Sequence, residues 1–226
     1  MRHTQSGNAF IYVLVAIALF AALAYTFTRS AQQGGSGNIS KQEAAIAASE
    51  ILSYARTIES AVNRVRVKNR CSENEISFEY DGYYINPSAP GTKKCHIFEP
   101  EGGNIEYLTM NPNTFSNGLQ YFGFNAGFQF TKVGSDLNDL ALQLNYLKKD
   151  VCLSINDKLG IPNNAGEPPE ENNDPAGTEG TFKGTFGTNK ADTVGDDGTG
   201  LSGKMAFCRL QSSVPHYQFI YVLLAR

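Results

Sequence analysis

The sequence predicts an α+β protein with an N-terminal apolar helix, an amphipathic helix, and an antiparallel β-sheet on which the second helix packs. Two patterns support this class. Apolar residues recur at helical spacing before Cys71, and aromatic residues alternate with polar ones after it. With 226 residues, 22 glycines, 14 phenylalanines and 11 tyrosines, the composition favours turns and aromatic strands in one domain with an appendage.

The N-terminal segment is an apolar run long enough to reach across a bilayer. Ala9 to Tyr25 contains no charged or amide side chain. With two further residues it gives about 28 Å of helix, close to the hydrocarbon core of about 30 Å. We therefore predict a cytoplasmic leader at 1–8 and a transmembrane helix at 9–28. The alternative is a secretory signal peptide that is cut before Tyr25. Both interpretations place the rest of the chain outside the cytoplasm.

A glycine-rich hinge is predicted at 29–39, and an exported α+β domain at 40–226. The first helix of this domain begins at Ser40, because Ser40 and Glu43 have the spacing of a capping box. One narrow apolar stripe runs down about seven turns of that helix. The stripe consists of Ala44, Ala48, Ile51, Ala55, Ile58, Val62 and Val65. It packs on the helix's own sheet or, in part, against a neighbouring subunit.

The rest of the domain combines strand signals with one helix and one loop. Strands are predicted at 76–85 as a hairpin around Asp81-Gly82, and at 105–110, 119–133 and 217–225. The third of these carries Phe122, Phe124, Phe128 and Phe130, which indicate a core-facing strand with a bend or bulge. Leucines at helical spacing predict a helix over 136–159. Residues 160–204, rich in glycine and acidic side chains, predict a long flexible acidic loop.

The four cysteines indicate two disulfides and an oxidising compartment. They are Cys71, Cys95, Cys152 and Cys208. The absence of a C-x-x-C spacing disfavours zinc and thioredoxin-type chemistry. Four cysteines allow three pairings, and their order along the chain favours Cys71 with Cys95 and Cys152 with Cys208. The second bridge would frame the glycine-rich loop.

The sequence contains none of the common catalytic motifs. It lacks G-x-S-x-G, a P-loop and H-E-x-x-H, so we predict that the protein is not an enzyme and holds no cofactor or metal. A formal net charge of −3 provides no basic field, so nucleic acid is not expected as a partner. Asp192, Asp196 and Asp197 are a candidate calcium cluster, although their spacing departs from an EF-hand.

A basic cluster ends the amphipathic helix. Arg64, Arg66, Lys68 and Arg70 suit the carbonyl end of the helix dipole as a solvated terminus. In a stacked assembly, the same cluster would pair with the acidic loop of a neighbouring subunit. Assembly would then weaken as the salt concentration rises.

The order of these segments resembles that of type IV pilins and pseudopilins. Ser6-Gly7-Asn8 directly precedes the apolar run, and the family's peptidase cuts after such a glycine, which implies processing between Gly7 and Asn8. The sequence is atypical because Asn8 replaces the usual phenylalanine-like first residue and Tyr12 replaces the usual glutamate. The resemblance implies a pilin-like fold, in which a disulfide commonly encloses a variable displayed segment.

The resemblance also implies a function. The protein would be a structural subunit of a bacterial envelope filament or secretion apparatus, in the inner membrane with one span and its C-terminal domain in the periplasm before assembly. Its partners would be the membrane, pilin-like subunits including copies of itself, and a prepilin-type peptidase. Assembly contacts would involve Ile51, Ala55, Ile58, Arg64, Arg66 and Lys68. The alternative is a secreted or membrane-tethered extracellular binding module, adhesin-like, that uses the loop or the aromatic sheet.

Overall fold

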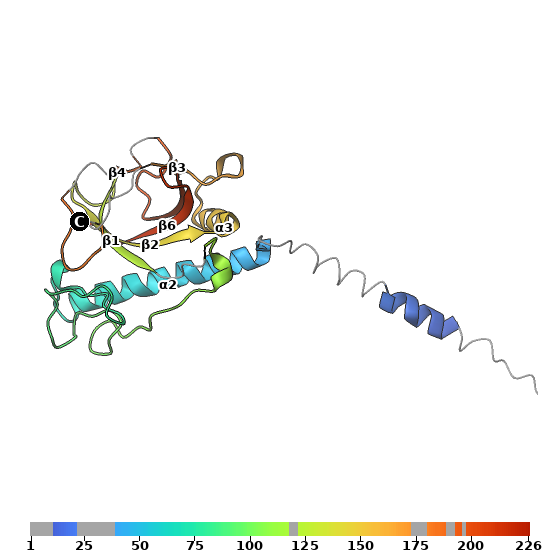
Figure 1. Ribbon diagram of the computed structural model, residues 1–226, viewed down its shortest axis with the longest axis horizontal. Helices are drawn as coiled ribbons and strands as arrows, with labels where there is room; N and C mark the ends of the chain where they lie inside the picture. Colours follow the sequence, from blue (N-terminus) through green and yellow to red (C-terminus); the bar gives the residue numbers. More distant parts are fainter. Residues whose placement is uncertain (1–10, 22–38, 118–121, 173–179, 189–192, 196–197) are drawn as a thin grey trace, which may run out of the picture. The chain divides into compact units, whose positions relative to one another are not determined.

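A computed structural model describes residues 11–21, 39–117, 122–172, 180–188, 193–195 and 198–226 (Figure 1). Contacts divide the chain into two units, Met1–Ser40 and Lys41–Arg226.

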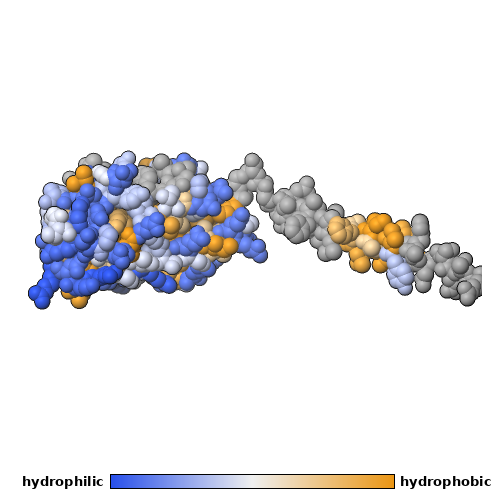
Figure 2. All heavy atoms as spheres, turned by 90° about the horizontal axis from the view of Figure 1, so that it is seen from below, coloured by the Kyte–Doolittle hydropathy of each residue, from blue (hydrophilic) through white to orange (hydrophobic). Residues whose placement is uncertain are grey.

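In the first unit, residues 11–21 form an α-helix whose side chains are exposed. Tyr12 is 68% and Phe20 77% exposed, and Figure 2 shows the segment as hydrophobic. Eleven residues span about 16 Å, which is roughly half of a hydrocarbon core. Over the described part of the chain, no helix combines the length and apolar character needed to cross a bilayer. This finding contradicts the predicted single-pass inner-membrane topology. The leader, both ends of the predicted 9–28 span and nearly all of the hinge lie outside the described residues.

The second unit begins with α2, Lys41–Val67, which confirms the predicted amphipathic helix. The whole apolar stripe from Ala44 to Val65 is buried. α2 packs mainly against α3, Lys149–Leu159, and the strand that it contacts most is β6, His216–Leu224. The stripe therefore faces the interior of its own domain.

The described strands form one six-stranded sheet (Figure 1). The strands are β1 Gly123–Phe130, β2 Asp139–Leu147, β3 Glu170–Glu171, β4 Thr193–Val194, β5 Ala206–Gln211 and β6 His216–Leu224, in the order β3-β5-β6-β2-β1-β4. The four long strands pair antiparallel, whereas β3 on β5 and β4 on β1 are parallel. β1 carries the register shift of a bulge between Asn125 and Phe128, as predicted.

The predicted fold class, a pilin-like helix packed on an antiparallel sheet, is wrong. The sheet is mixed, because the short edge strands β3 and β4 run parallel to their neighbours. These two edges also approach one another, since the backbone N–H of Gly195 donates to Glu171 Oε2 at 2.9 Å. The described residues thus form three α-helices and a nearly closed mixed sheet, and the helix α2 packs mostly on another helix.

The segment predicted as one helix over 136–159 is half strand. Residues 139–147 form β2, and only Lys149–Leu159 is helical. Leu140, Leu142 and Leu144 alternate with a period of two, yet β2 is central and its intervening Ala141 is buried too. A strand buried on both faces loses the alternation of polar residues that distinguishes it from a helix.

The segment 160–204, predicted as a flexible acidic loop, supplies β3, β4 and several buried apolar side chains. Phe182, Val194 and Leu201 are each at most 2% exposed. Val194 and Leu201 join the core cluster around Phe128 and Phe207. The described parts of this segment therefore belong to the packed domain.

Residues 71–117, which we call the irregular segment, contain no regular strand. They hold two short 3₁₀ turns, η1 Glu73–Glu75 and η2 Pro112–Thr114, and isolated bridges such as Tyr80 with Tyr83. The strands predicted at 76–85 and 105–110 are absent, although the predicted turn at Asp81-Gly82 is present. In Figure 1 this segment starts at the C-terminal end of α2 and then runs along the helix toward its N-terminal half.

Candidate functional site: a tyrosine-lined cleft

An open cleft of about 700 Å³ is bordered by the irregular segment and by residues after β3. We call it the tyrosine cleft. It is lined by Tyr80, Gly82, Tyr83, Tyr84, Ile85, Tyr107, Thr109, Thr181 and Lys183. Tyr83 is 70% and Ile85 54% exposed, so a large apolar area faces solvent at this site. Such exposed apolar area on a folded domain is characteristic of binding surfaces.

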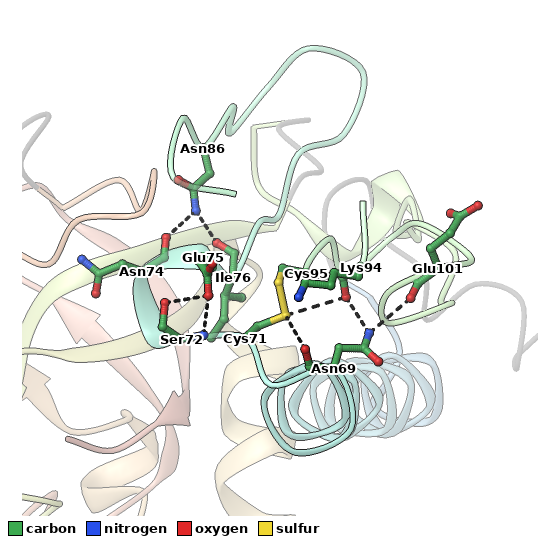
Figure 3. Close-up of a disulfide and its surroundings, with 10 residues drawn as sticks. All are labelled: Asn69, Cys71, Ser72, Asn74, Glu75, Ile76, Asn86, Lys94, Cys95 and Glu101. Atoms are coloured by element: carbon green, nitrogen blue, oxygen red, sulfur yellow. Dashed lines mark hydrogen bonds between the residues drawn. A yellow bond between two sulfur atoms is a disulfide. The ribbon is translucent and has the colours of Figure 1, made fainter. Parts of the chain in front are cut away.

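The frame of the cleft begins at the disulfide between Cys71 and Cys95 (Figure 3). Asn69, just before it, donates its side-chain amide to the carbonyl oxygens of Lys94 at 2.6 Å and Glu101 at 3.2 Å. The covalent bond and these hydrogen bonds hold both ends of the segment 71–101 against the end of α2. These bonds add to the backbone turn hydrogen bonds of a segment that has no strand ladder.

A second anchor fixes the base of the tyrosine-bearing loop. The buried Asn86 side chain donates to the carbonyl oxygens of Asn74 at 2.8 Å and Ile76 at 2.6 Å, as Figure 3 shows, and accepts from the Ser88 N–H at 2.8 Å. One amide therefore satisfies three backbone groups. Beside it, Ser72 and Glu75 form a capping box, and the Ser72 backbone N–H lowers the pKa of the Glu75 carboxyl.

The loop itself turns at Asp81-Gly82. Tyr80 and Tyr83 exchange two backbone hydrogen bonds of 3.1 and 2.8 Å across it. The φ angles of Asp81 (47°) and Gly82 (77°) are both positive, as a type I′ hairpin turn requires. The turn places Tyr80 and Tyr83 side by side, so both rings reach the cleft.

Aromatic contacts hold the wall of the cleft to which Tyr107 belongs. Tyr80 and Tyr107 stack with ring centroids 4.0 Å apart, and Phe98 meets Tyr107 edge-on at 5.3 Å. The segment that carries Tyr107 is tied to α2 by the Tyr54 hydroxyl, which donates to the Glu106 carbonyl at 2.8 Å and accepts from the Leu108 N–H at 2.9 Å. Burial raises the pKa of Tyr54 from its ordinary value of 10 to about 12, so its hydroxyl remains a donor well into the alkaline range.

Thr181 and Lys183 reach the cleft because Phe182 between them is buried. The Phe182 N–H donates to the Phe124 carbonyl at 2.9 Å, and its ring meets Phe78 edge-on. Alternate residues of an extended segment point to opposite sides, so Thr181 and Lys183 are exposed. None of the ion pairs found in the described part of the chain involves Lys183.

The chemistry of the cleft is that of recognition. Its described lining residues offer hydroxyl groups, aromatic faces and one ammonium group, and none of them carries a carboxylate or an imidazole to act as a general base. The described residues contain no group of three or more potential metal-ligating side chains. The lining can therefore bury apolar groups, form hydrogen bonds and attract an anion.

A second cavity, of about 500 Å³, is lined by a cationic side chain, Arg226, that already has partners within the domain. Arg226 in its lining is paired with Glu73 at 3.0 Å and lies 3.9 Å from the centroid of the Phe186 ring. Behind it, the fully buried Asp139 accepts the Arg226 N–H at 2.8 Å, and burial raises the pKa of this carboxyl to about 6. The cation of this cavity is therefore part of the domain's internal contacts, whereas Lys183 in the tyrosine cleft belongs to none of the ion pairs of the described residues.

The residues predicted from the sequence lie elsewhere. Cys71–Cys95 and Cys152–Cys208 are both bonded, which confirms the two disulfides. Ile51, Ala55 and Ile58, predicted for assembly, are fully buried in the domain. Arg64 donates to the Gly103 carbonyl, Arg66 pairs with Glu73, and Lys68 is exposed. Gly7, Asn8, Asp192, Asp196 and Asp197 lie outside the described residues.

Sequence reasoning missed the cleft. The four phenylalanines assigned to the core are buried, which confirms that prediction, and the accessible aromatic surface belongs to tyrosines instead. Tyr80, Tyr83 and Tyr84 around Asp81-Gly82 were a local signal, since tyrosines beside a tight turn are typical of binding loops. No local pattern links them to Thr181 and Lys183, about a hundred residues away in the sequence.

Comparison with protein-family models, with curated proteins and with solved structures finds no match to this chain.

Proposed function

We propose that residues 41–226 form a secreted binding module that takes its ligand in the tyrosine cleft. The observation that carries the proposal is the exposure of tyrosine rings on backbone that a disulfide and the Asn86 amide already hold in place. Tyrosine provides large contact area with few rotatable bonds, and a fixed backbone reduces the entropy lost on binding. Two disulfides support function in an oxidising compartment.

The test compares the full chain with Tyr83→Ser on two probe collections, a random heptapeptide library and a glycan microarray. Tyr83 is 70% exposed, so its removal takes apolar area from the cleft without opening the core. We expect the wild type to select at least one probe that Tyr83→Ser loses. Val214→Ser, which removes an apolar side chain that is 54% exposed outside the cleft, is the matched control and should retain binding. If no probe distinguishes wild type from Tyr83→Ser, the proposal fails.

A second candidate is the subunit of an envelope filament or secretion apparatus. The observation that favours it is the helix over residues 11–21, in which large apolar side chains such as Ile17 and Phe20 are exposed. A helix that is apolar all round needs a partner surface. Its small residues Ala16, Ala18 and Ala21 would allow another helix to approach closely.

Two measurements test this second candidate. The mass of the mature native protein gives its first residue: a start at Asn8 supports processing by a prepilin-type peptidase, and a start at Tyr25 removes the helix and eliminates the candidate. If the helix is retained, Ile17→Lys should abolish self-association in chemical cross-linking, whereas Lys158→Gln on the exposed face of α3 should not. Equal cross-linking of both variants would count against assembly through this helix.

A further inference from the structure

The tyrosine cleft carries a positive charge on one residue of its lining, and this charge restricts the class of ligand that fits. Among its described lining residues, Lys183 is the one charged side chain, and no ion pair of the described chain engages it. The surrounding groups are tyrosine rings, Ile85 and two threonine hydroxyls. An ammonium group beside an apolar surface attracts a ligand that carries a negative charge next to an apolar group.

The position of Lys183 is fixed by its neighbours. Phe182 before it is buried and bonded to β1, and Gly184 after it has a φ of +87°. A Cβ at Gly184 would lie 2.1 Å from Asn86 Oδ1, so the backbone beside Lys183 lies against the anchor of the tyrosine loop. The backbone that carries Lys183 is therefore held against the backbone of the tyrosine loop, so the ammonium group stays within reach of the aromatic wall.

The same lining disfavours sugars and nucleic acids. A saccharide presents many hydroxyl groups that require directed partners, yet the lining contains no side-chain amide and no carboxylate. A single-stranded nucleic acid requires a groove of positive charge along its backbone, and one lysine does not supply it. A volume of about 700 Å³ accommodates a drug-sized ligand, which corresponds to roughly two or three residues of a peptide.

We infer that the tyrosine cleft binds an acidic peptide segment, with a large apolar side chain among the rings of Tyr80 and Tyr83 and an adjacent carboxylate on the Lys183 ammonium. This inference rests on the proposed function, because it names the ligand class of the same cleft. The apolar contact provides most of the affinity, and the ion pair at the rim provides selection against neutral or basic sequences.

The experiment starts from heptapeptides that the full wild-type chain selects and Tyr83→Ser loses. We expect a consensus of an aromatic or aliphatic residue beside Asp or Glu. A fluorescein-labelled consensus peptide should bind about tenfold more weakly when its acid is replaced by the amide, and more weakly at high salt. Lys183→Gln should reduce affinity for the acidic peptide by a similar factor and leave the amide peptide unchanged. Lys158→Gln, the matched control outside the cleft, should change neither.

The possible outcomes separate the inference from the proposed function. If acidic and amide peptides bind equally, or Lys183→Gln has no selective effect, the inference is overturned while the binding function stands. The same holds if Tyr83-dependent binding is found for glycans and not for peptides. If neither collection contains a Tyr83-dependent probe, the binding function and the inference fail together.

Discussion

The sheet and the irregular segment are held together by different means. The long strands β1, β2, β5 and β6 share backbone ladders and bury phenylalanines between them. The irregular segment has no strand ladder, and its backbone is held by separate turn hydrogen bonds together with side-chain amides, one hydroxyl and a disulfide. A ladder distributes stability over many equivalent bonds, whereas the irregular segment depends more strongly on a few side chains. Single substitutions should therefore act globally in the sheet and locally in the irregular segment.

The largest effect should follow from removing the Cys152–Cys208 bridge. This bridge closes a sequence separation of 56 residues between α3 and β5. In the chain-entropy model its removal lowers the free energy of unfolding by about 4 kcal/mol. Urea denaturation of Cys152→Ala/Cys208→Ala should show one cooperative transition at a lower midpoint. A second transition in this variant would contradict the idea that the sheet region unfolds as a unit.

Removing the Cys71–Cys95 bridge should cost less, with a local signature. Its separation of 24 residues corresponds to about 3 kcal/mol. We expect hydrogen exchange in Cys71→Ala/Cys95→Ala to accelerate in residues 72–104. The amides of β2 and β6 should remain the most protected ones, ranked among themselves as in the wild type. Peptide binding at the tyrosine cleft should weaken too, because its frame loosens. Uniform loss of protection across both regions would eliminate the proposed distinction.

The pH dependence of stability should come from Asp139 in the sheet. Its pKa is raised to about 6 in the folded protein from an ordinary value of 3.8, so the folded state binds the proton more tightly. Its contribution to stability is full below about pH 4 and is lost as the pH rises through about 6. Asp139→Asn should remove this slope and raise the free energy of unfolding at pH 7 by about 2 to 3 kcal/mol.

Urea titrations of wild type and Asp139→Asn between pH 4 and 7 measure this difference. Asp157→Asn, on the exposed side of α3, is the control and should retain the wild-type slope. Parallel curves for wild type and Asp139→Asn would show that Asp139 does not titrate in this range.

The smallest effect on global stability should come from Asn86. Asn86→Ala removes the side chain that satisfies the Asn74 and Ile76 carbonyls and the Ser88 N–H, which costs about 1 to 3 kcal/mol. Exchange should accelerate chiefly in residues 74–90, and cleft affinity should fall. Asn111→Ala removes one exposed capping bond to the Asn113 N–H and serves as the control. A larger loss of stability from Asn111→Ala than from Asn86→Ala would be inconsistent with this account.

The sequence predicted the parts of the fold that depend on local periodicity. The stripe of α2, the aromatic β6 and the bulge in β1 are each encoded within a few turns or residues, and the structure confirms them. The prediction of the β2 segment was wrong because burial of both faces removes the alternation that marks a strand. The parallel edge strands were missed because each is two residues long and depends on a distant partner.

Less of the candidate site than of the fold could be predicted from local patterns in the sequence. The disulfides and the turn at Asp81-Gly82 could be anticipated from residue types, but the wall that Thr181 and Lys183 provide could not. Those residues reach the cleft through a backbone bond between Phe182 and Phe124, which no spacing in the sequence encodes. Residues predicted for assembly were selected for apolar periodicity, and that property identified the core of the domain instead.

The order of strands in the sheet has a consequence for the timing of folding. β6 follows the other strands in the chain, yet it lies between β5 and β2 and pairs with both. A polypeptide that emerges N-terminus first from a ribosome or a translocation pore cannot join these strands until residue 224 has emerged. Closure of the sheet therefore depends on a strand that is made after all the strands it joins.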